Sequence, residues 1–96
     1  MLVVCELVKQ PNLVEFTYKG KPRIAVIAVH GHHRTTNKEL VRAFQVHGAS
    51  STGPLPDWRL FAVSEMFNVV IRPEIAPQLP AEYRSMDSDL NVHCAR

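Results

Sequence analysis

The sequence predicts a mostly β fold, a small barrel of about five strands with a short helix before them. Apolar and polar side chains alternate over residues 13–18, residues 23–29 are apolar throughout, and further short apolar segments recur between turn-forming residues. Closure into a barrel removes the apolar edges that such strands otherwise expose. A chain of 96 residues has room for one modest core, so we expect a single domain spanning residues 1–96.

The N-terminal segment is predicted to be helical. Residues 2–9 can form two helical turns, and Pro11-Asn12 supplies the stop signal. The alternative is a short strand, because the run Leu2-Val3-Val4 favours β structure.

Two strands follow, joined by a tight turn. Residues 13–18 alternate as a half-buried strand does. One face of this strand carries Val14, Phe16 and Tyr18. Residues 19–22 form the turn, since glycine tolerates positive φ and proline cannot continue a ladder. The second strand, residues 23–29, is apolar on both faces and is therefore placed centrally.

The remaining strands are shorter and separated by polar or proline-rich segments. Residues 30–38 are predicted as a polar loop or wide hairpin, and residues 48–57 as a second loop. The third to fifth strands are residues 39–47, 58–63 and 67–72, with a turn at 64–66 and a last edge strand at 90–94. The side chains expected to be mostly buried are Val14, Phe16, Tyr18, Ile24, Val26, Leu60 and Val69.

Charge and cysteine content favour no particular compartment strongly. The net charge of +2 permits an acidic ligand without demanding one. Cys5 and Cys94 lie near opposite ends, and residues 1–8 lack the basic start and the uninterrupted apolar run of a secretory leader, so none is expected. We therefore expect a cytoplasmic protein with two free thiols. No apolar run approaches the ~18 residues of a membrane span, so no membrane association is expected.

A histidine cluster is the one candidate for metal binding. His30, His32 and His33 fall within four positions, and imidazole binds Zn²⁺ or Ni²⁺. The further ligand that such a site needs would come from Cys94, His93 or His47. Because no metal-binding motif supports this cluster, the interpretation favoured is a polar loop, with no metal and no cofactor.

Arginines beside aromatic residues mark the candidate ligand site. Arg42 is two positions from Phe44, and Arg59 is two from Phe61, so each pair projects to one face of its strand. Guanidinium groups bind phosphate, and aromatic rings stack on bases. The predicted ligand-binding residues are Arg42, Phe44, Trp58 and Arg59. The alternative is that the arginines cover the barrel exterior and form surface ion pairs, while Trp58 packs inside.

Catalytic constellations are not recognisable in the sequence. Cys5 and Cys94 lack the context of a nucleophilic cysteine, Ser50-Ser51 lacks a nucleophile elbow, and Asp87 and Asp89 lie near the C-terminus. The protein is therefore predicted not to be an enzyme.

Several short motifs, in their order and spacing, resemble the WYL-domain family. An apolar strand ends in Tyr18-Lys19-Gly20 before Arg23 and an apolar residue. The further matching segments are His33–Thr36, Leu40–Val46, Gly48–Ser51, Trp58–Phe61 and, more weakly, Tyr83–Asp87. The resemblance covers most of the chain, from about Val14 to Asp87. One departure stands out, because short members carry Glu-Pro-His where this chain has Val26-Ile27-Ala28.

The resemblance implies a fold and a function. WYL domains are Sm-like, SH3-like β-barrels that usually sit in bacterial transcription regulators and are thought to sense nucleotides or nucleic acid. A short form such as this one resembles the sensor barrel without its DNA-reading part. The resemblance implies that the strand arginines of the family correspond to Arg42, in the third strand, and Arg59, in the following one. The polar residues of the family are replaced at 26–28, so either the ligand site has degenerated or this apolar strand serves packing or self-association.

Two functions therefore remain open. The first is a sensing module for an anionic ligand, a nucleotide or single-stranded nucleic acid, with a separate DNA-binding regulator chain as its partner. The second is a structural or protein-interaction module that assembles into a homo-oligomer, which the apolar strand Ile24–Val29 favours.

Overall fold

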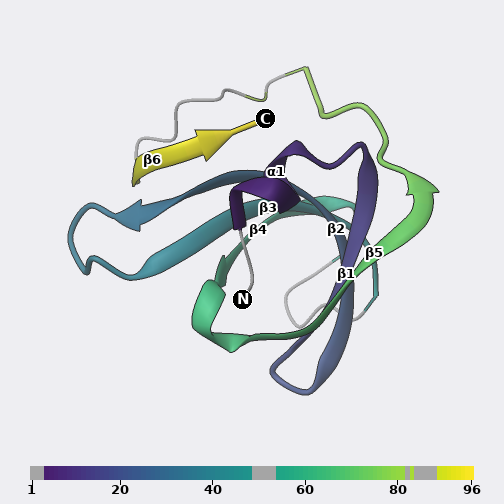
Figure 1. Ribbon diagram of the computed structural model, residues 1–96, viewed down its shortest axis with the longest axis horizontal. Coiled ribbons are helices and arrows are strands. Elements are labelled where there is room, and N and C mark those ends of the chain that lie inside the picture. Colours follow the sequence, from purple (N-terminus) through teal and green to yellow (C-terminus); the bar gives the residue numbers. More distant parts are fainter. Residues whose placement is uncertain (1–3, 49–53, 82, 84–88) are drawn as a thin grey trace.

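The computed structural model describes residues 4–48, 54–81, 83 and 89–96. Over this part of the chain it shows one short α-helix and six antiparallel strands (Figure 1), so the mostly β prediction is confirmed. The elements are α1 (Val4–Lys9), β1 (Asn12–Tyr18), β2 (Lys21–His33), β3 (Glu39–Gly48), β4 (Asp57–Ala62), the 3-10 helix η1 (Val63–Glu65), β5 (Met66–Ile75) and β6 (Leu90–Ala95).

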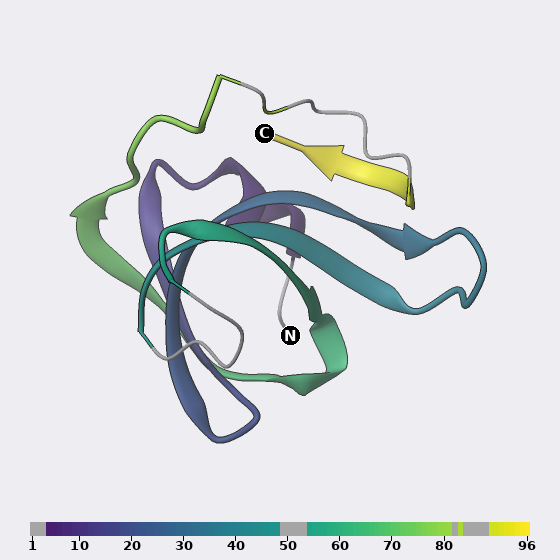
Figure 2. The same ribbon diagram turned by 180° about the vertical axis from the view of Figure 1, so that it is seen from behind.

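Strand β2 organises the sheet. The strand order is β4-β3-β2-β1-β5, and β6 pairs with β2 off this path. One edge of β2 pairs with β3 along most of its length. The other edge pairs first with β1, through Lys21–Ala25, and then with β6, through Val29–His33. A single long strand thus joins the beginning and the end of the chain, as the two opposite views show (Figures 1 and 2).

The sheet curls but is open in the part of the chain described. Strands β4 and β5 lie at its two ends and are connected through η1 rather than paired with each other. The closed SH3-like barrel is therefore not confirmed.

The boundaries of β1 and of the turn after it agree closely with those predicted, whereas β2 is longer than predicted. The hairpin from β1 to β2 turns through Lys19 and Gly20, both at positive φ, as a two-residue hairpin requires. For residues 30–38 the hairpin alternative is confirmed and the loop is not, because β2 continues to His33 and the turn to β3 begins at Arg34. Strand β3 pairs with His30–His32 on one edge, and β6 pairs with His30–His33 on the other, so these polar residues form a strand.

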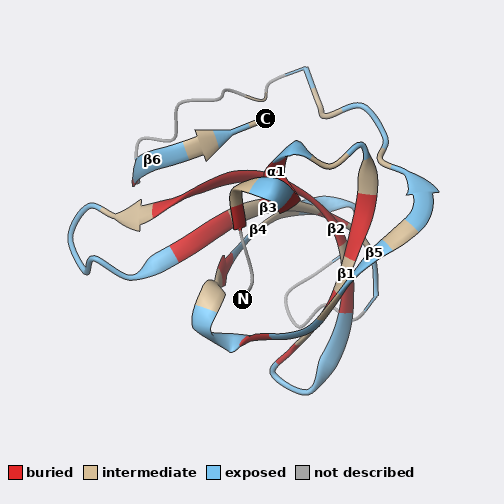
Figure 3. Cartoon of the chain, in the orientation of Figure 1, coloured by how far each residue is buried: buried red, intermediate tan, exposed pale blue. Residues whose placement is uncertain are grey.

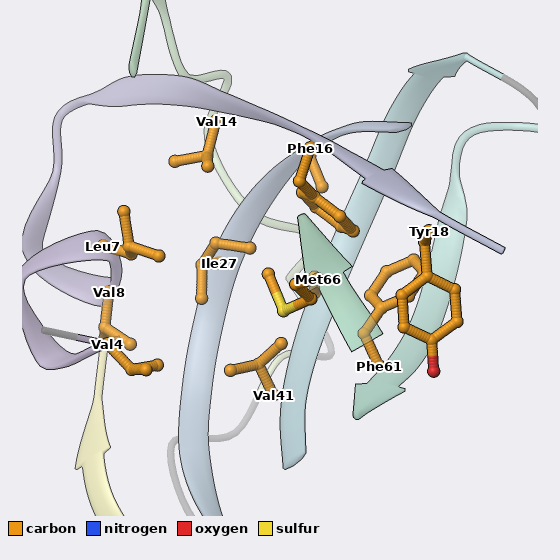
Figure 4. Packing of buried hydrophobic residues seen from close by; sticks show 12 residues of the cluster. Val4, Leu7, Val8, Val14, Phe16, Tyr18, Ile27, Val41, Phe61 and Met66 are labelled. Carbon is orange, nitrogen blue, oxygen red and sulfur yellow. The ribbon is translucent and has the colours of Figure 1, made fainter. Parts of the chain in front are cut away.

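The main core fills the inside of the curl (Figure 4). The alternation in β1 is confirmed, since Val14, Phe16 and Tyr18 are all buried. The ring of Phe16 meets that of Phe61 edge-to-face, with centroids 4.9 Å apart. Helix α1 adds Val4, Leu7 and Val8 to this cluster. Burying these side chains is the principal source of stability for such a sheet.

Of the four other positions predicted to be mostly buried, one is buried, two are half-buried and one is exposed. Val26 is buried, whereas Ile24 and Val69 are only half-buried. Leu60 is 37% exposed. It neighbours buried Phe61 on β4, and consecutive strand residues point to opposite faces, so only one of the two can enter the main core.

A second, smaller cluster covers the other face of β2 and β3. Its buried members are Ala28, Val29, Leu40 and Leu90, and Trp58, Ala62, Leu79 and Tyr83 pack against them. The chain between β5 and β6 supplies Leu79 and Tyr83. Packing on both faces explains why the apolar strand at 23–29 is central, as predicted, and why the middle of β2 is buried (Figure 3). Among the described residues, no helix has the length and apolar character needed to cross a membrane.

Candidate functional site

Phe44 and Trp58 form the centre of an aromatic face on β3 and β4. They are register partners, and their ring centroids lie 5.2 Å apart. Arg42 pairs with Leu60 one step along the same two strands. Residues opposite each other in an antiparallel pair project to the same side, so Arg42 lies on the side of both rings. We call this surface, made by Arg42, Phe44, Trp58 and Leu60, the aromatic face.

Tyr83 covers part of the aromatic face. Its ring stacks on Trp58, with centroids 5.6 Å apart and an interplanar angle of 17°. Its hydroxyl donates to the backbone oxygen of Arg96 at 2.9 Å. Burial raises the pKa of the Tyr83 hydroxyl. Sequence reasoning placed Tyr83 only within the weak end of the family resemblance; an aromatic residue just after a proline-rich segment was the available signal.

Arg42 forms an ion pair with Asp89, the residue just before β6. Its Nη2 lies 3.2 Å from Asp89 Oδ2, with 25% of the arginine side chain and 61% of the aspartate side chain exposed. A pair this open to solvent contributes little stability, about 0–1 kcal/mol.

Arg59 lies on the opposite side of the β3–β4 pair. It is the register partner of Ala43, which belongs to the main core. Its Nη1 donates to Asp57 Oδ2 at 2.7 Å and to the Trp58 carbonyl at 3.0 Å. The hydrogen bond from Arg59, a second one from the Trp58 backbone N–H to Asp57 Oδ1 at 2.8 Å, and the charge of Arg59 hold the pKa of the Asp57 carboxyl below its usual value. The structure thus brings together three of the four predicted site residues, Arg42, Phe44 and Trp58.

The histidines divide into two groups. His30 and His32 lie on β2 beside His93 of β6; Nδ1 of His32 is 2.5 Å from Nε2 of His93, and Nε2 of His30 is 2.7 Å from Glu39 Oε2. His33 instead accepts hydrogen bonds at Nδ1 from the backbone N–H groups of Thr35 and Thr36. It therefore shapes the turn rather than joining a cluster.

Cys5 and Cys94 form a disulfide, which corrects the expectation of two free thiols. The bond links α1 to β6 across 89 positions. The cysteines meet because α1 packs against β2 and β6 while β6 pairs with β2. A disulfide requires Cα atoms within about 7 Å, and no local sequence pattern reveals a distance between chain ends.

Comparisons with models of protein families, with curated proteins and with solved structures find no match to this chain.

Proposed function

We propose that the protein is a non-enzymatic binding module for an anionic ligand, a nucleotide or single-stranded nucleic acid. The observation that carries the proposal is the placement of Arg42 on the same face as the paired rings of Phe44 and Trp58. A ring platform with a neighbouring guanidinium matches the two parts of a nucleotide. Bases stack on aromatic side chains for about 1–3 kcal/mol each, and arginine binds phosphate through its bidentate fork.

The chain's own residues already make both kinds of contact. Tyr83 stacks on Trp58 as a base would, and Asp89 pairs with Arg42 as a phosphate would. We infer that a ligand displaces these two side chains. Binding then exchanges one stacking contact and one exposed ion pair for stronger charge-assisted contacts.

The motifs that resemble WYL domains extend the proposal to a regulatory role. The protein would act as a ligand sensor on an SH3-like fold, with a separate DNA-binding regulator chain as its partner. A cytoplasmic location belongs to the same proposal.

The test is a fluorescence titration. The chain has one tryptophan, so intrinsic emission reports on Trp58 alone, and a labelled oligonucleotide gives an independent signal. We expect quenching of Trp58 and saturable binding that weakens as salt rises, because phosphate contacts release counterions. Absence of binding at low salt to both oligonucleotides and nucleotides would reject the proposal.

A second candidate function, self-assembly or protein interaction, is favoured by strand β5. Among the described strands β5 pairs only with β1, and Figure 3 shows how much of it is exposed. Its exposed apolar side chains are Phe67, Val70, Ile71 and Ile75. Exposed apolar edge strands are sites of pairing between chains. The strand at 24–29, which suggested assembly in the sequence, is mostly buried against other parts of the same chain and no longer supports it.

Size-exclusion chromatography separates the two functions. Self-assembly predicts an oligomer without nucleic acid that Phe67→Lys and Val70→Lys dissociate, whereas ligand binding predicts a monomer whose elution changes when oligonucleotide is added. Leu60→Lys, on the aromatic face, is the matched control for the two β5 variants.

A further inference from the structure

Two cysteines and a histidine from three elements meet where β6 pairs with β2. His30 Nδ1 lies 3.8 Å from Cys5 Sγ and 3.7 Å from Cys94 Sγ. The potential ligand atoms of the three residues all lie within 4.8 Å of one another. His30 and Cys94 are register partners, and Cys5 comes from α1. His30 is buried and the cysteines are half-buried, so the group is fixed by the fold yet reachable from solvent.

Glu39 orients the imidazole of His30. Its Oε2 lies 2.7 Å from His30 Nε2. In a neutral imidazole, this contact favours the proton on Nε2, because a carboxylate accepts hydrogen bonds. Nδ1, the ring nitrogen nearest the two sulfur atoms, is then the one able to bind a metal ion. In metal sites, the histidine ring nitrogen that does not bind the metal usually donates to a carboxylate in this way.

The distances fit a tetrahedral metal ion. With zinc–sulfur bonds of about 2.3 Å and zinc–nitrogen bonds of about 2.0 Å, neighbouring nitrogen and sulfur ligands lie about 3.5 Å apart. The two observed nitrogen–sulfur distances, 3.7 and 3.8 Å, are close to this value. Only the sulfur atoms have to separate, to about 3.8 Å, and reduction of the disulfide allows that movement.

We propose that this cluster is a redox-controlled binding site for Zn²⁺ or a similar thiolate-preferring divalent ion. The oxidised protein holds the disulfide and has no thiolate ligand. A dithiol reductant transfers two electrons and two protons to the S–S bond and becomes a disulfide itself. The metal then displaces the two thiol protons into solvent and binds Cys5 Sγ, Cys94 Sγ and His30 Nδ1. Water takes the fourth position, and Glu39 is a positioning residue.

The experiment uses the full chain in both redox states. Protein reduced with a phosphine is desalted without oxygen and titrated with Co²⁺, whose thiolate charge-transfer absorption reports sulfur ligation. Zn²⁺ affinity is then measured by competition with a chromophoric chelator. We expect one ion per reduced chain and no thiolate-ligated ion in the oxidised chain.

Variants assign the ligands. Cys94→Ser and His30→Ala should each lower Zn²⁺ affinity more than Glu39→Gln does. Glu39→Gln should lower it about 10–100-fold, as loss of an outer-shell partner does, while keeping the thiolate absorption. His33→Ala is the matched control, because His33 lies on the same strand but bonds the backbone of the turn. Its affinity should equal that of the unsubstituted chain.

If reduction unfolds the chain, circular dichroism measures whether Zn²⁺ refolds it. Refolding by one equivalent of Zn²⁺ would support the site, and failure of Zn²⁺ to refold it would reject it. Ion binding without thiolate absorption, equal in both redox states and lost in His93→Ala, would also reject the proposal. That result would assign the ion to His32 and His93, whose nitrogens already lie close together. Binding indifferent to His30→Ala would reject the proposal as well.

Discussion

Arg42 and Arg59 lie on opposite faces of the β3–β4 pair. Arg42 is opposite Leu60 and shares its side with Phe44 and Trp58, whereas Arg59 is opposite the core residue Ala43. Each arginine is ion-paired, Arg42 with Asp89 and Arg59 with Asp57. One ligand stacked on the aromatic face can therefore reach Arg42 directly but has the sheet between it and the backbone position of Arg59.

The first prediction compares these two arginines. Arg42→Ala should weaken oligonucleotide binding by about 1.5–3 kcal/mol, the contribution of a hydrogen bond to a charged group, and Arg42→Lys should also weaken it because a point charge lacks the fork. Arg59→Ala should have the smaller effect. Arg72→Ala on β5, whose guanidinium pairs with Glu15 and Glu74, is the control. Titrations in which Arg59→Ala weakens binding and Arg42→Ala does not would place the ligand on the other face.

The second prediction concerns Tyr83, which occupies the position over Trp58. Tyr83→Ser removes a stacked ring and should raise the affinity for oligonucleotide, because the ligand no longer competes with an intramolecular contact. The emission of Trp58 should change in the free protein as well. Tyr83→Phe, which keeps the ring and loses the bond to the Arg96 carbonyl, is the matched control. Equal affinities for the Ser and Phe variants would show that the ring does not compete.

The third prediction tests the main core. Phe16 is 1% exposed, so Phe16→Ala should lower the free energy of unfolding by about 3–5 kcal/mol. Leu60→Ala, at a position that is 37% exposed, should cost about 1 kcal/mol or less. Denaturant titrations measure both. A Phe16→Ala variant as stable as the parent would contradict the face assignment in β1.

How far the sequence predicted this structure depended on the range of the interactions. Alternation and turn chemistry are local, so β1, the Lys19-Gly20 turn and helix α1 were found. The continuation of β2 through His30–His33 is paired on one edge with β3, the next strand, and on the other with β6, which comes from the other end of the chain. Polar composition alone therefore left a loop and a wide hairpin as alternatives for residues 30–38.

The prediction of the candidate site was limited in the same way, because it depends on how β3 and β4 pair. Alternation correctly placed Arg42 with Phe44, and Arg59 with Phe61, on one face of each strand. Which face of β4 meets which face of β3 is set by the pairing register, and a shift of one residue reverses it. Alternation within each strand does not give that register, so it could not show that Arg42 and Arg59 lie on opposite faces of the β3–β4 pair. The disulfide was missed for a related reason, since it joins the two ends of the chain.

The fourth prediction follows from the lowered pKa of Asp57. Because Arg59 stabilises the ionised form, the pair contributes stability above the ordinary aspartate pKa of about 3.9. That contribution is lost as pH falls through the depressed pKa of the folded state. NMR titration of the carboxyl carbon should give a low pKa for Asp57 that returns toward the ordinary value in Arg59→Gln. Arg72→Gln should instead raise the pKa of Glu74 and leave Asp57 unchanged; an Asp57 pKa indifferent to Arg59→Gln would contradict the assigned cause.

The fifth prediction is that the stability of the oxidised protein depends on the disulfide and not on a bound metal ion. The bond spans 89 positions, and cross-links closing loops of this size typically stabilise by about 2–5 kcal/mol, chiefly by restricting the unfolded chain. Reduction should lower the melting temperature, whereas a chelator added to the oxidised protein should leave it unchanged, because the S–S bond joins α1 to β6 without an ion. Cys5→Ser should melt with the reduced parent in the absence of metal. Calorimetry in the four combinations of reductant and chelator measures this, and unfolding of the oxidised protein by chelator alone would contradict it.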